Sequence, residues 1–190
     1  MKTITSLLFL FTAIFLTSCE GPVGPPGPPG NDGADGEALI GTVFETDPIN
    51  FTANTDPSYS YLFQFPSDFE IYDGDVVLVY ILWEQDSTND GGTTDVWRLL
   101  PQTVVLDDGI LQYNFDHTTA DVRIFLEGTT DFNNLLPAES ENQIFRIAVV
   151  PAALAKNNNI DVTDFNAVMK SMHLNLNSIE KINPSLQQNK

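Results

Sequence analysis

Glycine occupies every third position from residue 21 to residue 36, six times in succession. The residues between these glycines are mostly proline in the first half of the tract 21–38, and the second half contains Asp32, Asp35 and Glu37. A strict Gly-X-Y period is typical of the collagen triple helix, in which only glycine fits at the axis shared by three chains. The tract therefore predicts either a trimer or an extended polyproline-II spacer.

The spacer is the favoured of these two structures. Ordering three such short tails costs more conformational entropy than a helix of six triplets recovers. The acidic second half adds repulsion between chains. As a polyproline-II segment the tract reaches at most about 55 Å, at about 3.1 Å per residue. We therefore expect a monomer, with a homotrimer through the tract as the alternative.

An export signal precedes the tract. Lys2 supplies a positive charge, residues 7–16 form an apolar run of ten residues, and the small residues Thr17 and Ser18 follow. Ten residues make about 15 Å of helix, which is about half of the hydrocarbon core of a bilayer. The pattern therefore predicts a signal peptide over residues 1–18 that is cleaved on export, rather than a membrane span.

The end of this signal resembles the bacterial lipobox, on the residues Leu16, Thr17, Ser18 and Cys19. The resemblance implies cleavage before Cys19, a diacylglycerol on its thiol, and attachment to the bacterial cell envelope through that lipid. An ordinary signal peptide followed by a chance cysteine is the alternative. Because two or more acyl chains hold a protein firmly, a membrane is the expected partner at Cys19.

The charge and composition restrict the remaining partners. The chain has 26 Asp and Glu against 8 Lys and Arg, for a formal net charge of −18. This charge disfavours nucleic acid and anionic lipid surfaces. Thirteen Phe, five Tyr and two Trp supply enough apolar surface for a folded core. The single cysteine excludes an internal disulfide.

From residue 39 onward, short apolar runs are separated by turn signals. The four aromatic residues at alternate positions from Tyr59 to Phe65 are expected on one face of a strand. Residues 76–83 are continuously apolar, which predicts a central strand covered on both faces. The pattern predicts a mainly β fold, an antiparallel β-sandwich over residues 39–173, with a small open barrel as the alternative.

One short C-terminal helix is also expected. Phe165, Val168, Met169 and Met172 follow the helical spacing of a single apolar stripe, with Thr163 as the expected N-cap. Residues 174–190 are rich in Asn, Gln and Ser, which predicts a flexible polar tail.

The inventory of catalytic groups is small. His117 is expected in a turn and His173 at a helix C-terminus, where the helix dipole alone favours histidine. The sequence contains no phosphate-binding loop, dinucleotide fingerprint or zinc-protease motif. We therefore expect no catalytic residue and a protein that is not an enzyme.

Two binding hypotheses remain. Asp86, Asp90 and Asp95 are weak candidates for a calcium site, because Trp97 stands where an EF-hand loop needs a bidentate glutamate. Trp83 and Trp97 lie equally far from Asp90, so a hairpin centred there makes them cross-strand neighbours. If both rings face solvent, they form a candidate platform for a glycan or a peptide; burial in the core is the alternative.

Several segments together carry a wider resemblance: the lipobox, the Gly-X-Y tract, DVVLVYILWE, DVWRLLPQT, LQYNFD and NQIFRIAVVPA. They resemble a family of short bacterial collagen-like lipoproteins, over nearly the whole chain. The resemblance implies a location at the cell envelope and adds no catalytic residue. We expect a membrane-anchored lipoprotein with a non-catalytic binding or structural β domain, whose partner is a glycan or an envelope protein. A glycan- or calcium-binding accessory domain is the alternative.

Overall fold

Nine strands form two sheets in the computed structural model, which describes residues 41–55, 57–157 and 160–182. The expected signal peptide, Cys19 and the Gly-X-Y tract lie outside these residues. The strands are β1 (Thr42–Thr46), β2 (Ser60–Gln64), β3 (Val76–Ser87), β4 (Thr93–Leu99), β5 (Gln102–Leu106), β6 (Gly109–His117), β7 (Asp121–Gly128), β8 (Phe145–Val150) and β9 (Glu180–Ile182).

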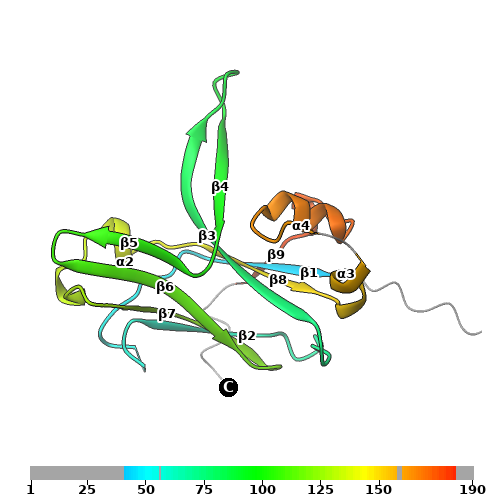
Figure 1. Cartoon of the computed structure of the whole chain (residues 1–190), viewed down its shortest axis with the longest axis horizontal. Helices are drawn as coiled ribbons and strands as arrows, with labels where there is room; N and C mark the ends of the chain where they lie inside the picture. Colours follow the sequence, from blue (N-terminus) through cyan, green and yellow to red (C-terminus); the bar gives the residue numbers. More distant parts are fainter. Residues whose placement is uncertain (1–40, 56, 158–159, 183–190) are drawn as a thin grey trace, which may run out of the picture. The chain divides into compact units, whose positions relative to one another are not determined.

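One sheet has the strand order β4-β3-β8-β1-β9 and the other has the order β2-β7-β6-β5 (Figure 1). Every pairing is antiparallel except that of β1 with β9, which is parallel. The predicted mainly β fold, with antiparallel pairing, is confirmed. The open-barrel alternative is wrong, because the strands belong to two separate sheets.

A large apolar core contains side chains of both sheets. Along β3 the alternation is complete: Val77, Val79 and Ile81 enter this core, whereas Leu78 and Tyr80 enter a second cluster on the other side of the sheet. The prediction of a central strand covered on both faces is therefore confirmed. The four aromatic residues from Tyr59 to Phe65 also belong to or pack against the first core, as expected.

Helix α4 (Phe165–Ser171) covers the outer face of the five-stranded sheet. Its apolar stripe packs on that face through the four residues that the sequence indicated. The predicted N-cap is wrong by one residue, because Asp164 accepts the hydrogen bond from the Asn166 amide over 2.9 Å. The Thr163 hydroxyl instead donates to Asp161 over 2.6 Å.

The described residues contain three α-helices rather than the single one expected. Besides α4 these are α2 (Pro137–Ser140) and α3 (Ala152–Asn157). Two turns of 3-10 helix, η2 (Phe132–Asn134) and η3 (Leu176–Ser178), complete the set. Proline occupies the first helical position of α2, where its missing N–H has no intrahelical partner to lose. Short helices of this kind carry too few residues for a periodic signal.

The expected flexible tail is wrong for residues 174–182. This segment contains η3 and then β9, which pairs in parallel with β1 at the sheet edge. Lys181 of β9 also lies 3.2 Å from Glu45 of β1. These contacts are made with residues far away in the sequence, so local composition did not indicate them. Residues 183–190 lie outside the described part of the chain.

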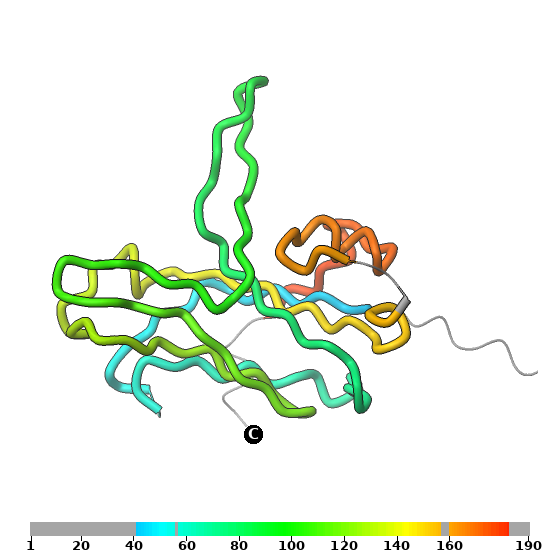
Figure 2. Tube along the Cα trace, viewed as in Figure 1, coloured from blue at the N-terminus to red at the C-terminus, as the bar shows by residue number. Residues whose placement is uncertain are grey.

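The distal halves of β3 and β4 form a ribbon that stands away from the sheets (Figures 1 and 2). We call residues 84–96 the β3–β4 ribbon. Strand β8 pairs with β3 only as far as Ile81, so the ribbon continues with two strands alone. Its tip turns at Gly91, whose φ of +83° lies in the left-handed region that glycine adopts at low cost.

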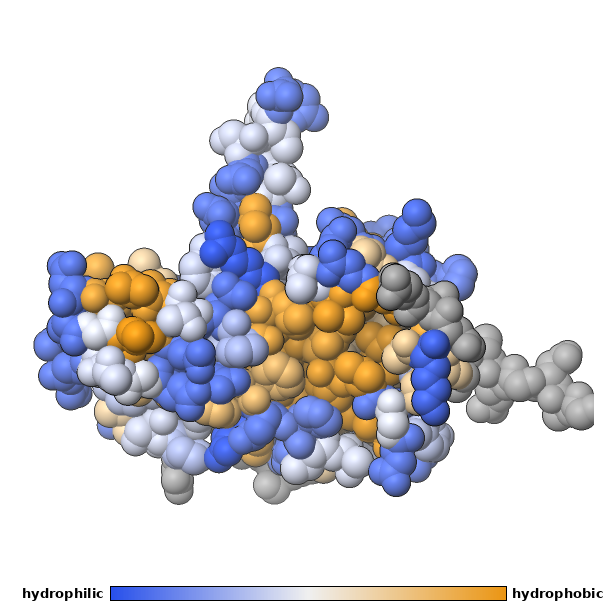
Figure 3. Space-filling model, viewed as in Figure 1, coloured by the Kyte–Doolittle hydropathy of each residue, from blue (hydrophilic) through white to orange (hydrophobic). Residues whose placement is uncertain are grey.

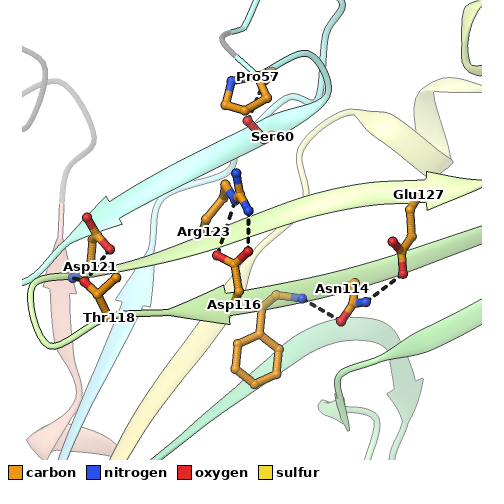
Figure 4. A network of polar contacts seen from close by, with 9 residues as sticks. Pro57, Ser60, Asn114, Asp116, Thr118, Asp121, Arg123 and Glu127 are labelled. Carbon is orange, nitrogen blue, oxygen red and sulfur yellow. Dashed lines mark hydrogen bonds and ion pairs between the residues drawn. The ribbon is translucent and has the colours of Figure 1, made fainter.

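Polar side chains form a hydrogen-bonded network on the outward side of the four-stranded sheet (Figure 4), beside the exposed apolar residues Leu62, Val105 and Ile110. Across β6 and β7, Arg123 pairs with Asp116, and the Asn114 amide donates to Glu127 over 2.7 Å. The alternation of these residues with buried ones matches a sheet with one face on the core and one in water.

Candidate functional site

A cleft of about 250 Å³ opens where β3 leaves the sheets and becomes the ribbon. We call it the Trp83 cleft. Its walls come from β3, from β5 and β6 of the opposite sheet, and from α2 and the segment before β8. The lining residues are Ile81, Leu82, Trp83, Val104, Tyr113, Ala138, Glu139 and Gln143.

A β-bulge positions Trp83 in this cleft. The register of β3 against β4 shifts between Leu82 and Glu84, so Trp83 has no direct partner on β4. The ring packs against the core between the sheets and meets Tyr113 edge to face, with 6.5 Å between ring centroids. Bulges commonly redirect a side chain in this way.

Arg98 of β4 covers the Trp83 ring. Its guanidinium carbon lies 4.3 Å from the ring centroid, a cation–π distance. The same guanidinium lies 3.5 Å from the Glu84 carboxylate. These two contacts hold the indole in place and pair the Arg98 charge with that of Glu84.

Most polar groups of the cleft already have a partner. The Tyr113 hydroxyl donates to the Glu139 carbonyl oxygen over 2.6 Å, and Glu139 Oε2 accepts from the Leu136 amide over 2.7 Å. Burial, and secondly the charge of Glu139, raise the pKa of Tyr113 to about 12. Gln143 Nε2 donates to the Ala138 and Glu141 carbonyls over 3.1 and 2.8 Å.

Two hydrogen-bonding atoms of the cleft are open to solvent. Within the described ranges, no group accepts from the Trp83 indole N–H and none donates to Gln143 Oε1. The cleft thus combines aromatic and aliphatic walls with a donor and acceptors at its rim. This combination is typical of small-ligand sites.

Two other hollows lie on the five-stranded sheet and beside α4. One is a small apolar hollow of about 80 Å³ on the outer face of β3 and β8, in the apolar area seen beside the ribbon in Figure 3. It is lined by aliphatic side chains alone, which offer no polar group to orient a ligand. The other is a broad surface depression of about 550 Å³ beside Lys170 and His173 at the C-terminal end of α4.

The expected pairing of Trp83 with Trp97 is wrong. Because of the bulge, Trp97 lies opposite Leu82, and its ring packs in the other cluster, under α4. The Arg146 guanidinium lies between the rings of Trp97 and Phe165, 3.9 Å from the first centroid and 4.8 Å from the second. The two indoles therefore do not form one platform.

The structure does not bring the three calcium candidates together. Asp86 pairs with Thr94 and Asp95 with Gln85, so the two carboxylates lie on opposite faces of the ribbon. Gln85 donates to Asp95 over 2.7 Å. Asp90 caps the turn at the tip, where hydrogen bonds from the Thr88 hydroxyl and the Gly92 amide hold its pKa below the ordinary value. No three metal-binding side chains are grouped in the described part of the chain.

The two histidines are exposed and lie at the ends of elements. His117 ends β6, and its Nδ1 lies 3.4 Å from the Thr118 carbonyl oxygen. His173 follows α4 with a φ of +57°. Neither lines the Trp83 cleft.

Sequence reasoning missed the other main residues of the cleft. The alternation of LQYNFD places Tyr113 on the inner face of β6, which is a usable signal. Glu139 and Gln143 gave no comparable signal, because a short helix and an irregular segment position them.

Comparisons with known proteins give no further guidance: no family model, curated protein or solved structure matches this chain. Within the residues that the structure describes, no helix is both long and apolar enough to cross a membrane.

Proposed function

We propose that this chain is an exported, lipid-anchored protein of the bacterial cell envelope, whose β domain has a non-catalytic binding role outside the membrane. One observation carries the proposal: Cys19 follows the small residues Thr17 and Ser18 directly at the end of an apolar run too short to span a bilayer. Position and residue type coincide at the point where lipid attachment requires both.

The rest of the chain is consistent with this arrangement. The Gly-X-Y tract, as a spacer, separates the anchor from the β domain by up to about 55 Å. We retain a monomer as the expected state. The apolar side chains of the β domain pack largely into its two clusters, and the outward side of its four-stranded sheet carries paired polar side chains, as suits a domain surrounded by water.

A binding role is preferred to a purely structural one because of the Trp83 cleft. Its apolar walls, with the solvent-open indole N–H and Gln143 side-chain oxygen, offer a ligand both apolar and hydrogen-bonding contacts.

The anchor is tested by expressing the full chain in a bacterium supplied with an alkyne-tagged fatty acid. We expect label on the protein, a mature N-terminus at residue 19, and accumulation of the unprocessed precursor when lipoprotein signal peptidase is inhibited. Cys19→Ser removes the label, whereas Ser18→Ala, which keeps a small residue before the cysteine, retains it. Mass spectrometry that finds an unmodified thiol at Cys19 in the processed protein overturns the proposal.

A further inference from the structure

We propose that the Trp83 cleft binds the ring of a neutral sugar, as part of an envelope glycan. The inference rests on the binding role proposed above and names its ligand class. Three features of the cleft support it: the balance of charge, the unused hydrogen-bonding atoms and the size.

The balance of charge favours an uncharged ligand. Glu139 lines the cleft, and the nearby Arg98 guanidinium is paired with Glu84 at 3.5 Å, so in a chain whose formal net charge is −18 an anionic ligand is disfavoured. A cationic group that uses the indole as a cation–π partner competes with Arg98, whose guanidinium already lies 4.3 Å from the Trp83 centroid.

The unused hydrogen-bonding atoms suit hydroxyl groups. Gln143 commits its amide nitrogen to two backbone carbonyls, which leaves the side-chain oxygen as an acceptor. The Trp83 N–H is a donor only. A hydroxyl donates to the Gln143 oxygen and accepts from the Trp83 N–H. A sugar ring carries several hydroxyls beside C–H faces that can pack on Leu82 and Val104.

The size of the cleft limits the ligand. Clefts that enclose drug-sized ligands have volumes of about 300–1,000 Å³. The Trp83 cleft, at about 250 Å³, is smaller, so it accommodates a single ring with its neighbours outside.

The chain's two tryptophans allow a direct test. The full chain is labelled with 5-fluorotryptophan, purified from membranes in detergent, and titrated with three neutral trisaccharides built of glucose, mannose or N-acetylglucosamine. We expect the fluorine resonance of Trp83 to shift saturably with at least one of them. The resonance of Trp97, which packs against the other cluster beside Arg146 and Phe165, stays in place and serves as the internal reference. Single tryptophan-to-phenylalanine variants assign the two signals.

Two adjacent residues provide matched variants. Val104 lines the cleft, whereas Val105 is 81% exposed on the opposite face of β5. Val104→Phe fills the cleft and abolishes the shift, while Val105→Phe leaves it unchanged. An unchanged Trp97 resonance shows that each variant is folded.

Glu139→Gln separates a neutral ligand from a cationic one. It keeps an oxygen for the Leu136 amide, and it changes the affinity for a neutral sugar by less than about threefold, or about 0.7 kcal/mol. Two results overturn the inference. One is no shift of the Trp83 resonance with any trisaccharide at 50 mM. The other is a shift with Nα-acetyl-lysine amide, a cationic probe, that Glu139→Gln abolishes. Lipid attachment is measured on the same preparation, so the failure of sugar binding and the failure of anchoring are distinguished.

Discussion

Arg146 is stacked on Trp97, with its guanidinium carbon 3.9 Å from the ring centroid, and its Nε donates to Glu45 over 2.8 Å. Phe165 of α4 flanks the same guanidinium at 4.8 Å. The side chains of Arg146 and Glu45 are only 10% and 13% exposed. Helix α4 therefore packs over the Arg146–Glu45 ion pair, which lies within an otherwise apolar cluster.

Removing one member of this pair is expected to be costly. Glu45→Ala leaves the Arg146 charge buried without a carboxylate, and we expect the free energy of unfolding to fall by about 3 kcal/mol. Urea unfolding followed by far-ultraviolet circular dichroism measures the change.

The double variant Glu45→Gln/Arg146→Met removes both charges, and it is expected to lie within about 1 kcal/mol of the parent chain. Lys181 pairs with the same Glu45 carboxylate, but its side chain is exposed. Lys181→Ala is therefore expected to change the free energy of unfolding by less than about 1 kcal/mol. A double variant less stable than Glu45→Ala would contradict this reading of the pair.

Two glycines with positive φ are expected to differ sharply in their tolerance of alanine. At Gly128, with φ of +151°, a Cβ would lie 1.9 Å from the Ile110 carbonyl oxygen. At Gly91, with φ of +83°, a Cβ meets nothing within 4 Å. We expect Gly91→Ala to cost about 1 kcal/mol and Gly128→Ala about 3 kcal/mol or more. Thermal unfolding of the two variants measures the difference, and equal melting temperatures would contradict it.

The β3–β4 ribbon is expected to open more readily than the rest of β3. Two-stranded ribbons without a third strand are marginally stable in water. Residues 77–81 instead pair with β8 within the five-stranded sheet, and Tyr80 and Ile81 pair with β4 as well. Native-state hydrogen exchange of backbone amides should show exchange at least about 100-fold faster in residues 84–96 than in residues 77–81. Uniform protection along β3 would show that something else covers the ribbon.

Alkaline pH is expected to destabilise the fold. Burial, and secondly the charges of Asp47 and Glu139 respectively, raise the pKa values of Tyr61 and Tyr113 to about 12. Both phenols have a higher pKa in the folded chain than the ordinary value of 10.0. Their contribution to stability is therefore complete below pH 10 and is lost as the pH rises from 10 towards 12.

Absorbance at 295 nm, which follows phenolate formation, and urea unfolding at each pH test this prediction. Tyr113→Phe removes one of the titrating groups, so its stability should decline less steeply between pH 10 and pH 12. A decline as steep as that of the parent chain would assign the effect to other groups.

Local patterns predicted the parts of the fold that depend on alternation. The side chains of the apolar run in β3 and of the alternating aromatic residues around β2 lie in the clusters that the alternation predicted. Successive side chains in a strand point to opposite faces. The helical stripe of Phe165 and Val168 was found for the same reason at helical spacing.

Features that depend on a single residue or on distant contacts escaped this reasoning. Composition does not indicate an offset of one residue, so the bulge at Trp83 was missed and Trp97 was assigned the wrong partner. Strand β9 is three residues long and is held by pairing with β1, which lies more than a hundred residues earlier in the chain. The polar residues of the cleft were missed because an irregular segment supplies Gln143.

The bulge also separates two parts of β3 that tolerate change differently. Before the bulge, β3 supplies side chains to both clusters, so each added or deleted residue would exchange its inward and outward faces. Beyond the bulge, β3 and β4 pair only with each other and lie in solvent. Insertions at Gly91 and Gly92 should therefore leave Trp83 in place. The tip of the ribbon is thus a suitable place to graft an epitope or an affinity tag and display it clear of the protein.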